Sequence, residues 1–175
     1  MEYDAIIQLK TKKAYTLIEL VAVMTLIAII AVVGFVALRS YRHQYLRAAG
    51  HRLVNDLKYA RNLALTSGVW HGVSCEVSSQ AYTVYATNGT VDTVLSKPSA
   101  PGQDFIVSLV DDYNGVSFDS VDFSGGNKVE FSPYGVPYTD VLGLAFTTTA
   151  EVCLSADTYG LTIKVEPETG RILIE

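Results

Sequence analysis

The stretch KKAYTLIELVAVMTLIAIIAVVGFVAL, residues 12–38, decides the fold of this chain. From Leu20 to Leu38 only Thr25 and Gly34 interrupt a run of apolar residues. At 1.5 Å of rise per residue, a helix of this length nearly crosses a bilayer core of about 30 Å. We therefore predict a transmembrane helix over residues 15–38. The run does not end in the small-residue cleavage site of a secretory signal peptide, so we expect the helix to stay in the mature protein.

Glu19 is the one carboxylate inside this apolar stretch, a short distance after Lys12 and Lys13. A charged side chain at mid-membrane costs about 2.5–3.5 kcal/mol on insertion scales, so such a residue is either shallow or functional. In the shallow interpretation, the side chain reaches the interface at the lysine-flanked end. In the functional interpretation, it meets a positive partner inside a bundle of helices.

Charge is unevenly distributed along the 175 residues, whose net charge is −5. Between Arg39 and Arg61 there are six Lys or Arg residues and one acid, whereas residues 62–175 hold four basic and fourteen acidic residues, a net charge of −10. Phosphate binding needs basic side chains clustered on one face, so the acidic body argues against a nucleic-acid platform. The basic stem suits anionic lipid head groups or acidic neighbouring subunits.

The chain contains two cysteines, Cys75 and Cys153, which form neither a CxxC pair nor part of a metal-ligand cluster. In an extracytoplasmic compartment they are candidates for one disulfide, and in the cytoplasm they would be buried free thiols. Both alternatives stay open. The chain has no HExxH, GxSxG or Walker motif, and its three histidines are dispersed. We therefore expect no enzymatic activity, no cofactor and no metal.

An amphipathic helix is predicted to continue from the apolar segment to Ser67, where Gly68 suits the left-handed position after a helix. Its apolar residues recur every three or four positions, as in a helix with one buried face. They are Leu46, Ala49, Leu53, Leu57, Ala60 and Ala64.

After Gly68 the apolar period changes to two, which predicts short strands separated by turns. The predicted strands are 73–77, 81–86, 90–95, 105–109, 115–123, 128–131, 142–146, 151–154, 161–165 and 171–174. Many short strands at this spacing indicate an antiparallel β body of two sheets or one curled sheet, with the helix across a face. Residues 97–104 hold two of the five prolines and are predicted to form a mobile loop. The fold class is therefore α+β.

The segment TKKAYTLIEL, residues 11–20, resembles the N-terminal signal of type IV prepilins and type II secretion pseudopilins. The resemblance implies cleavage by a prepilin peptidase between Ala14 and Tyr15 and N-methylation of Tyr15. It also implies that Glu19 meets the N-terminal amine of a neighbouring subunit during assembly. Alanine stands here where these signals usually have glycine, and tyrosine where phenylalanine is usual.

The resemblance also divides the chain into four parts. Residues 1–14 would be the leader, 15–38 the transmembrane and assembly helix, 39–68 its amphipathic half, and 69–175 a periplasmic β-rich domain. The expected protein is a single-pass protein of the bacterial inner membrane that is incorporated into a filament through contacts with other pilins or pseudopilins.

Residues 48–69 and the final hairpin, LTIKVEPETGRILIE, resemble the GspH/FimT group of these proteins. In that group the helix carries an Ala-Arg pair and then reaches a glycine before the first strand, and Arg61, after Ala60, is expected to be a structural residue at the rim of the sheet. A DNA-binding branch of the group has a second arginine two residues after its Gly-Arg turn, whereas here Leu173 stands in that place after Arg171. A minor pseudopilin or pilin is thus the main prediction. A DNA-binding competence pilin using Arg171 and an uncleaved membrane-anchored β domain are the alternatives.

Overall fold

The computed structural model describes residues 16–175, except for the side chains of residues 33–40. The described residues fall into two compact units, a first that ends at Arg39 and a second of residues 40–175. In the part of the chain that the structure describes, no helix combines the length and mean hydropathy of a membrane span.

Helix α1 (Leu17–Ser67) runs from the first unit into the second. In the second unit its predicted apolar stripe, from Leu46 to Ala64, is buried throughout. The helix ends where the sequence predicts, because Gly68 adopts the left-handed conformation (φ 70°) and its N–H donates to the carbonyl of Ala64 at 3.2 Å. Both the stripe and the helix end are therefore confirmed.

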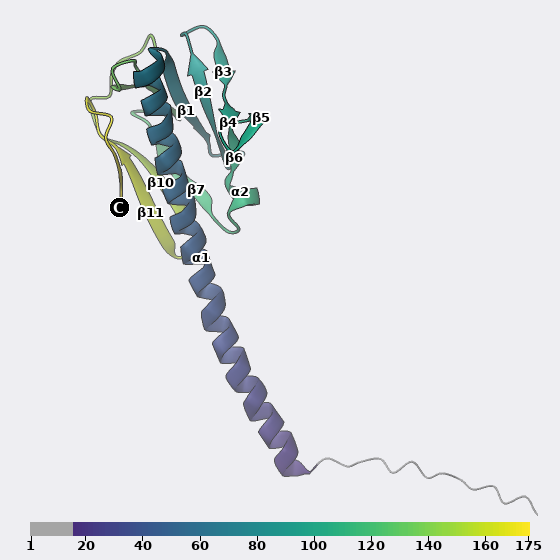
Figure 1. Ribbon diagram of the computed structural model, residues 1–175. Coiled ribbons are helices and arrows are strands. Elements are labelled where there is room, and N and C mark those ends of the chain that lie inside the picture. The colour runs from purple at the N-terminus through teal and green to yellow at the C-terminus, as the bar shows by residue number, and fades with distance from the viewer. Residues whose placement is uncertain (1–15) are drawn as a thin grey trace, which may run out of the picture. The chain divides into compact units, whose positions relative to one another are not determined.

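The rest of the second unit is antiparallel β structure in three sheets (Figure 1). The six-stranded sheet has the order β3 (Asp92–Val94), β2 (Ala81–Thr87), β1 (Trp70–Glu76), β8 (Lys128–Phe131) and β9 (Pro137–Tyr138), with β6 (Ile106–Ser108) also paired to β2. The four-stranded sheet has the order β12 (Ile172–Ile174), β11 (Tyr159–Val165), β10 (Ala150–Ala156) and β7 (Ser117–Asp122). The third sheet is the hairpin of β4 (Ser96–Lys97) and β5 (Ala100–Asp104).

One hydrophobic core joins the second half of α1 to both large sheets. The inward side chains alternate along the strands, as Val73 and Cys75 on β1 and Val152 and Leu154 on β10 show. Burying one face of each sheet against the helix stripe removes most of the apolar surface of the body from water, which is the main driving force for its folding. The predicted α+β fold, a helix packed on antiparallel sheets, is confirmed.

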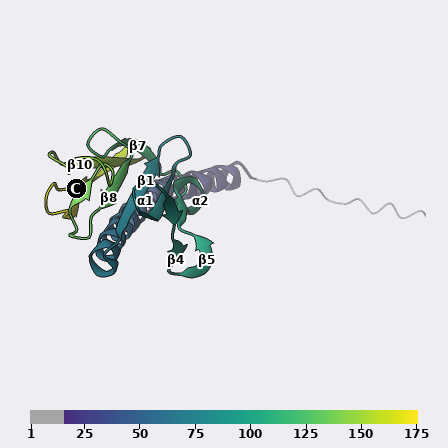
Figure 2. The same ribbon diagram turned by 90° about the horizontal axis from the view of Figure 1, so that it is seen from above.

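Three predicted segments differ from the structure. Residues 142–146 are not a strand, and within them only Ala145 makes an isolated bridge, to Tyr138. The residues before Ala145 form a turn instead, in which the N–H of Gly143 donates to the carbonyl of Asp140. Residues 97–104 are not a loop but part of the β4–β5 hairpin, and Pro98 lies in its turn. This hairpin projects from the body (Figure 2). Residues 105–109 form β6 and the start of a short helix, α2 (Leu109–Asp112).

A buried polar network fastens α1 to the six-stranded sheet. Asp56, 7% exposed, accepts hydrogen bonds through Oδ2 from the Tyr82 hydroxyl at 2.7 Å and from Nε of Arg52 at 2.8 Å. Burial raises the pKa of Tyr82 above its ordinary value, and the neighbouring Asp56 carboxylate raises it further. The phenol therefore stays protonated and remains a donor to Asp56.

We predict that Asp56→Ala destabilises the body by about 1–3 kcal/mol, because the change leaves a buried hydroxyl without an acceptor. Tyr82→Phe, which removes the donor and keeps the ring, should cost less, about 0.5–1.5 kcal/mol. Urea unfolding of the full chain in detergent, followed by circular dichroism, measures both. The neighbouring exposed residue supplies the control: Asn55→Ala should change stability by less than about 0.5 kcal/mol. Equal effects of Asp56→Ala and Asn55→Ala would contradict the role of the network.

Candidate functional site

Thr16 caps the first turn of α1, the segment in which the sequence places the assembly carboxylate. The N–H of Glu19 donates to Thr16 Oγ1 at 3.3 Å and to the Thr16 carbonyl at 3.1 Å. Threonine followed three residues later by glutamate is the spacing of a capping box. A negative charge in the first turn is also favoured by the helix dipole. The structure shows the Thr16 half of this motif, the bond from the Glu19 N–H to Thr16 Oγ1.

The helix beyond this turn is apolar on all sides and exposed on all sides. Every described side chain from Leu17 to Val32 is exposed, with 83% exposure for Leu17 and 66% for Val32. Within this stretch Leu20, Val23 and Met24 line a shallow depression together with Glu19. A helix that is hydrophobic all round is normally buried in a larger assembly or in a membrane. This unit therefore presents an apolar surface that needs a partner, with one carboxylate near its beginning.

Ala14 and Tyr15, the residues of the predicted cleavage and methylation site, lie outside the described residues. The two cysteines lie in different sheets: Cys75 is buried on β1 opposite Tyr82, and Cys153 is partly buried on β10. Both are free thiols in this structure.

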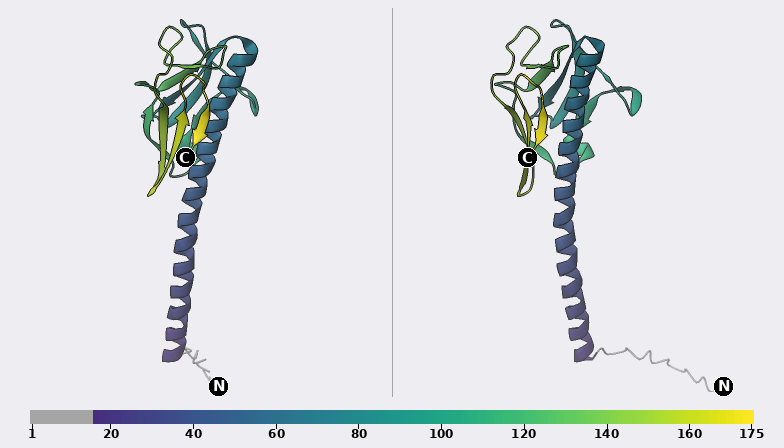
Figure 3. Two further views of the ribbon diagram at one scale, coloured as in Figure 1. Left: turned by 90° about the vertical axis from the view of Figure 1, so that its left-hand side faces the viewer. Right: turned by 60° about the vertical axis from the view of Figure 1, so that its left-hand side comes forward.

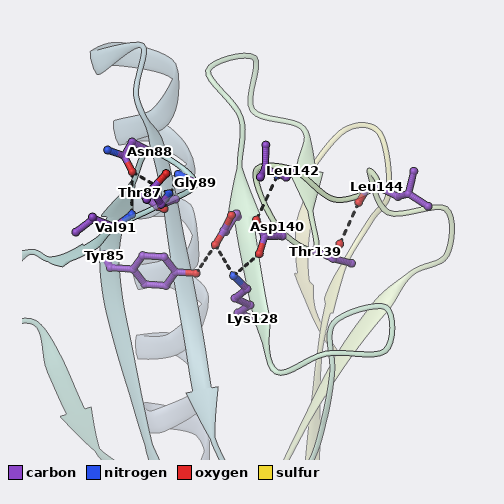
Figure 4. Close-up of polar contacts among 12 residues, drawn as sticks. Tyr85, Thr87, Asn88, Gly89, Val91, Lys128, Thr139, Asp140, Leu142 and Leu144 are labelled. Carbon is purple, nitrogen blue, oxygen red and sulfur yellow. Dashed lines mark hydrogen bonds and ion pairs between the residues drawn. The ribbon is translucent and has the colours of Figure 1, made fainter.

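A buried carboxylate lies on the outer face of the six-stranded sheet (Figure 4). Glu130 on β8 is 1% exposed, and its Oε1 accepts from the Tyr85 hydroxyl at 2.8 Å and from Lys128 Nζ at 3.0 Å. Lys128 Nζ also donates to Asp140 Oδ2 at 2.9 Å. Burial lowers the pKa of Lys128, but the hydrogen bonds to Asp140 and Glu130 outweigh this and raise it above its ordinary value. The ammonium thus links the buried glutamate to the loop after β9.

Gly72 makes this arrangement possible. Tyr85 and Glu130 are the cross-strand partners of Gly72 on either side of it. The Tyr85 ring crosses over the glycine, since a Cβ there would lie 2.7 Å from the ring and 2.9 Å from the carbonyl oxygen of Val129. This burial could not be predicted from the sequence, because in the alternating segment KVEF the position of Glu130 is typical of an exposed polar residue.

The loop that follows Asp140 carries two leucines into solvent. Leu142 is 86% exposed and Leu144 is 80% exposed, while the N–H of Leu142 donates to Asp140 Oδ1 at 3.2 Å. The Lys128 hydrogen bond lowers the pKa of Asp140, so this carboxylate stays charged. This ion pair and two backbone hydrogen bonds, from Gly143 to Asp140 and from Thr139 to Leu144, hold the loop in place.

Arg61 occupies the rim position that the resemblance implied and joins two loops. Its Nε donates to the carbonyl of Gly135 at 3.2 Å and its Nη2 to the carbonyl of Thr169 at 2.9 Å. Arg171, the candidate DNA-binding residue, lies across a groove from Lys58 and Arg61, and the groove also reaches Ile172 and Leu173. Three basic side chains far apart in the sequence are therefore brought together beside β12. Among the described residues, no His, Cys, Asp or Glu side chains form a group that could hold a metal.

We predict that Gly72→Ala destabilises the body by about 1–3 kcal/mol, because the added methyl group displaces the Tyr85 hydroxyl and leaves the Glu130 carboxylate under-bonded. Gly160→Ala is the matched control: this strand glycine has open space around its Cβ position, so the change should be neutral or slightly stabilising. Denaturant unfolding of both variants measures the difference. A neutral Gly72→Ala variant would show that the Tyr85–Glu130 hydrogen bond contributes nothing to stability.

Comparison with known proteins agrees with this architecture. A family described as Type II transport protein GspH matches residues 49–169, and the Prokaryotic N-terminal methylation motif matches residues 9–35. The comparison with curated proteins gave no match.

Among solved structures, the minor pseudopilin EpsH from the Type 2 Secretion System of Vibrio cholerae has a TM-score of 0.54 at 11% identity, covering 74% of this chain and 95% of that one. The type IV minor pilin FimU of Pseudomonas aeruginosa has a TM-score of 0.50 at 16% identity, covering 76% and 90%. At these identities the likeness shows the fold. Because the family match covers more than half of its residues, this chain belongs to the GspH family and carries the N-terminal methylation motif.

Proposed function

We propose that this protein is a structural subunit, a minor pseudopilin or minor pilin, of a type II secretion pseudopilus or a type IV pilus. The observation that carries the proposal is the first half of α1: an apolar helix exposed on every side, with Glu19 in its first turn and within the matched methylation motif. Such a surface is suited to packing among like helices rather than to chemistry on a substrate.

In this proposal the chain crosses the bacterial inner membrane once, with its β body in the periplasm. A prepilin peptidase cuts between Ala14 and Tyr15, and the new amine of Tyr15 is methylated. The N-terminal ammonium of one subunit then meets the Glu19 carboxylate of its neighbour. A charge that is costly in an apolar bundle is stable only beside its partner, so the pair fixes the offset between helices.

A DNA-binding competence pilin is the second candidate, favoured by the groove that gathers Lys58, Arg61 and Arg171. Against it stands the charge of residues 62–175, which is −10 and would repel phosphate over most of the body. Arg61 is also already bonded to two backbone carbonyls. We therefore prefer the assembly function.

The first test is mass spectrometry of the N-terminal peptide from membranes of the native host. We expect a terminus at Tyr15 that carries an N-methyl group. An intact leader would remove the amine that Glu19 is proposed to meet. The protein would then be an uncleaved, membrane-anchored β domain.

We predict that Glu19→Gln reduces incorporation into filaments at least about tenfold, since breaking a buried ion pair costs several kcal/mol and about 1.4 kcal/mol is a factor of ten. Glutamine still fits a capping box, so the variant removes the charge and keeps the helix start. Quantitative immunoblotting of sheared filaments measures incorporation.

Thr16→Ala provides the opposite control. It removes the cap but keeps the carboxylate, so incorporation should stay within about twofold of the wild type. If Thr16→Ala fails to assemble while Glu19→Gln assembles normally, Glu19 acts only in the capping of α1.

A further inference from the structure

Strand β12 leaves one side of its backbone unpaired. It pairs with β11 alone, at the edge of the four-stranded sheet. Thr162 and Glu175 exchange both backbone hydrogen bonds, at 3.0 and 2.8 Å, and the N–H of Glu166 donates to the carbonyl of Arg171 at 2.8 Å. Because bonded positions alternate in an antiparallel pair, Leu173 faces β11 and the backbone groups of Ile172 and Ile174 face outward. In the described part of the chain, these outward groups have no hydrogen-bond partner.

The opposite edge of the same sheet is capped at Phe118. On β7, the N–H of Phe118 donates to Gln80 Oε1 at 2.5 Å, and Gln80 Nε2 donates to the carbonyl of Phe118 at 3.4 Å. A register shift between Cys153 and Leu154 also disturbs the ladder there. Side-chain caps and bulges are two ways in which proteins block an edge strand from pairing with other chains. The β7 edge is therefore interrupted at Phe118, whereas the described residues show no such cap on β12.

The unprotected edge borders the basic groove. In both views of Figure 3, β12, in yellow, runs beside α1, and the groove lined by Lys58, Arg61, Arg171 and Ile172 lies there. The groove has a volume of about 610 Å³, within the usual range for ligand sites. Lys58 and Arg171 are exposed and form no ion pair within the described residues. Both cations are therefore available to an acidic ligand.

We propose that the β12 edge binds an extended acidic segment of a partner protein as an added strand. Alternate backbone groups of such a segment would pair with Ile172 and Ile174, and its carboxylates would meet Lys58 and Arg171. Strand addition of this kind takes its affinity from the main chain and its specificity from side chains. A nucleic acid could satisfy the cations but has no regular row of N–H and carbonyl groups for the strand. The observations therefore favour a peptide.

This inference goes beyond the assembly function and does not depend on it, because it concerns the body and not the apolar half of α1. A failure of peptide binding leaves filament assembly untouched. A failure of Glu19-dependent assembly likewise leaves the β12 edge available.

The probe is a short fluorescent peptide of alternating valine and aspartate, titrated by anisotropy against the full chain in detergent micelles. Its control is the same peptide with N-methyl groups on alternate residues, which keeps every charge but removes the donors along one edge. We expect the N-methylated peptide to bind at least about tenfold more weakly. Equal affinity of the two peptides, or no binding of either, would overturn the proposal.

Two charge-reversal variants test the groove. Arg171→Glu should weaken binding at least about fivefold, because it places a like charge against the peptide. Lys97→Glu makes the same change on the β4–β5 hairpin, away from the groove, and should leave the affinity within about twofold, since long-range charge effects are screened by salt. Equal losses in both variants would indicate non-specific attraction and would overturn strand addition.

Amide hydrogen exchange, read by NMR, locates the contact independently of these variants. Peptide binding should slow exchange at Ile172 and Ile174, which face outward, more than at Leu173, which is already bonded to β11. Protection confined to other strands would contradict the proposal. Tighter binding of oligothymidylate than of the peptide, lost in Arg171→Glu, would overturn it in favour of a nucleic-acid site.

Discussion

The burial of one stripe of α1 between two sheets is the constraint on which the rest of the body depends. Small residues make the approach close: Ala49, Ala60 and Ala64 are fully buried, and a side chain on Gly50 would collide with Leu161 of β11. The buried side chains of the helix stripe and of both large sheets form one hydrophobic cluster. The Arg52–Asp56–Tyr82 network then fixes the helix to one sheet by hydrogen bonds rather than by packing alone.

Much of this fold could be predicted from the local spacing of apolar residues along the sequence. The stripe of α1 recurs every three or four residues and ends at a glycine, so its burial and its end follow from helix geometry. Strands such as β10 and β11 alternate regularly and were found close to their observed bounds. The segment 142–146 has the same apolar composition but lies in a loop, because its first residues form a turn closed by the Gly143–Asp140 backbone hydrogen bond. Asp140 is in turn held by the more distant Lys128. The β4–β5 hairpin was missed because its prolines suggested disorder, whereas Pro98 lies in the turn that joins the two strands.

Among the candidate sites, too, those that depend on local spacing could be predicted from the sequence, and those that depend on distant residues could not. Glu19 stands out in the sequence because it is a charge in an apolar segment, and the capping spacing with Thr16 is equally local. The buried Glu130 could not be found, since its burial depends on the absence of a side chain at Gly72 on a neighbouring strand. The groove beside β12 combines residues from α1 and from the last hairpin, which only the folded chain brings together. Contacts between residues that are far apart in the sequence cannot be predicted from the residue spacing within one segment.

The cap that Gln80 places on Phe118 limits how copies of this protein can associate. A sheet with two open edges presents a self-complementary pair of surfaces, and head-to-tail pairing of such surfaces does not close, so it can grow into fibres. Because the Phe118 backbone is already bonded to Gln80, a strand added to β7 would lose the hydrogen bonds at that position. The cap and the neighbouring bulge therefore disfavour a sheet that continues from one copy into the next, and they favour regular polymerisation through surfaces other than the sheet edges.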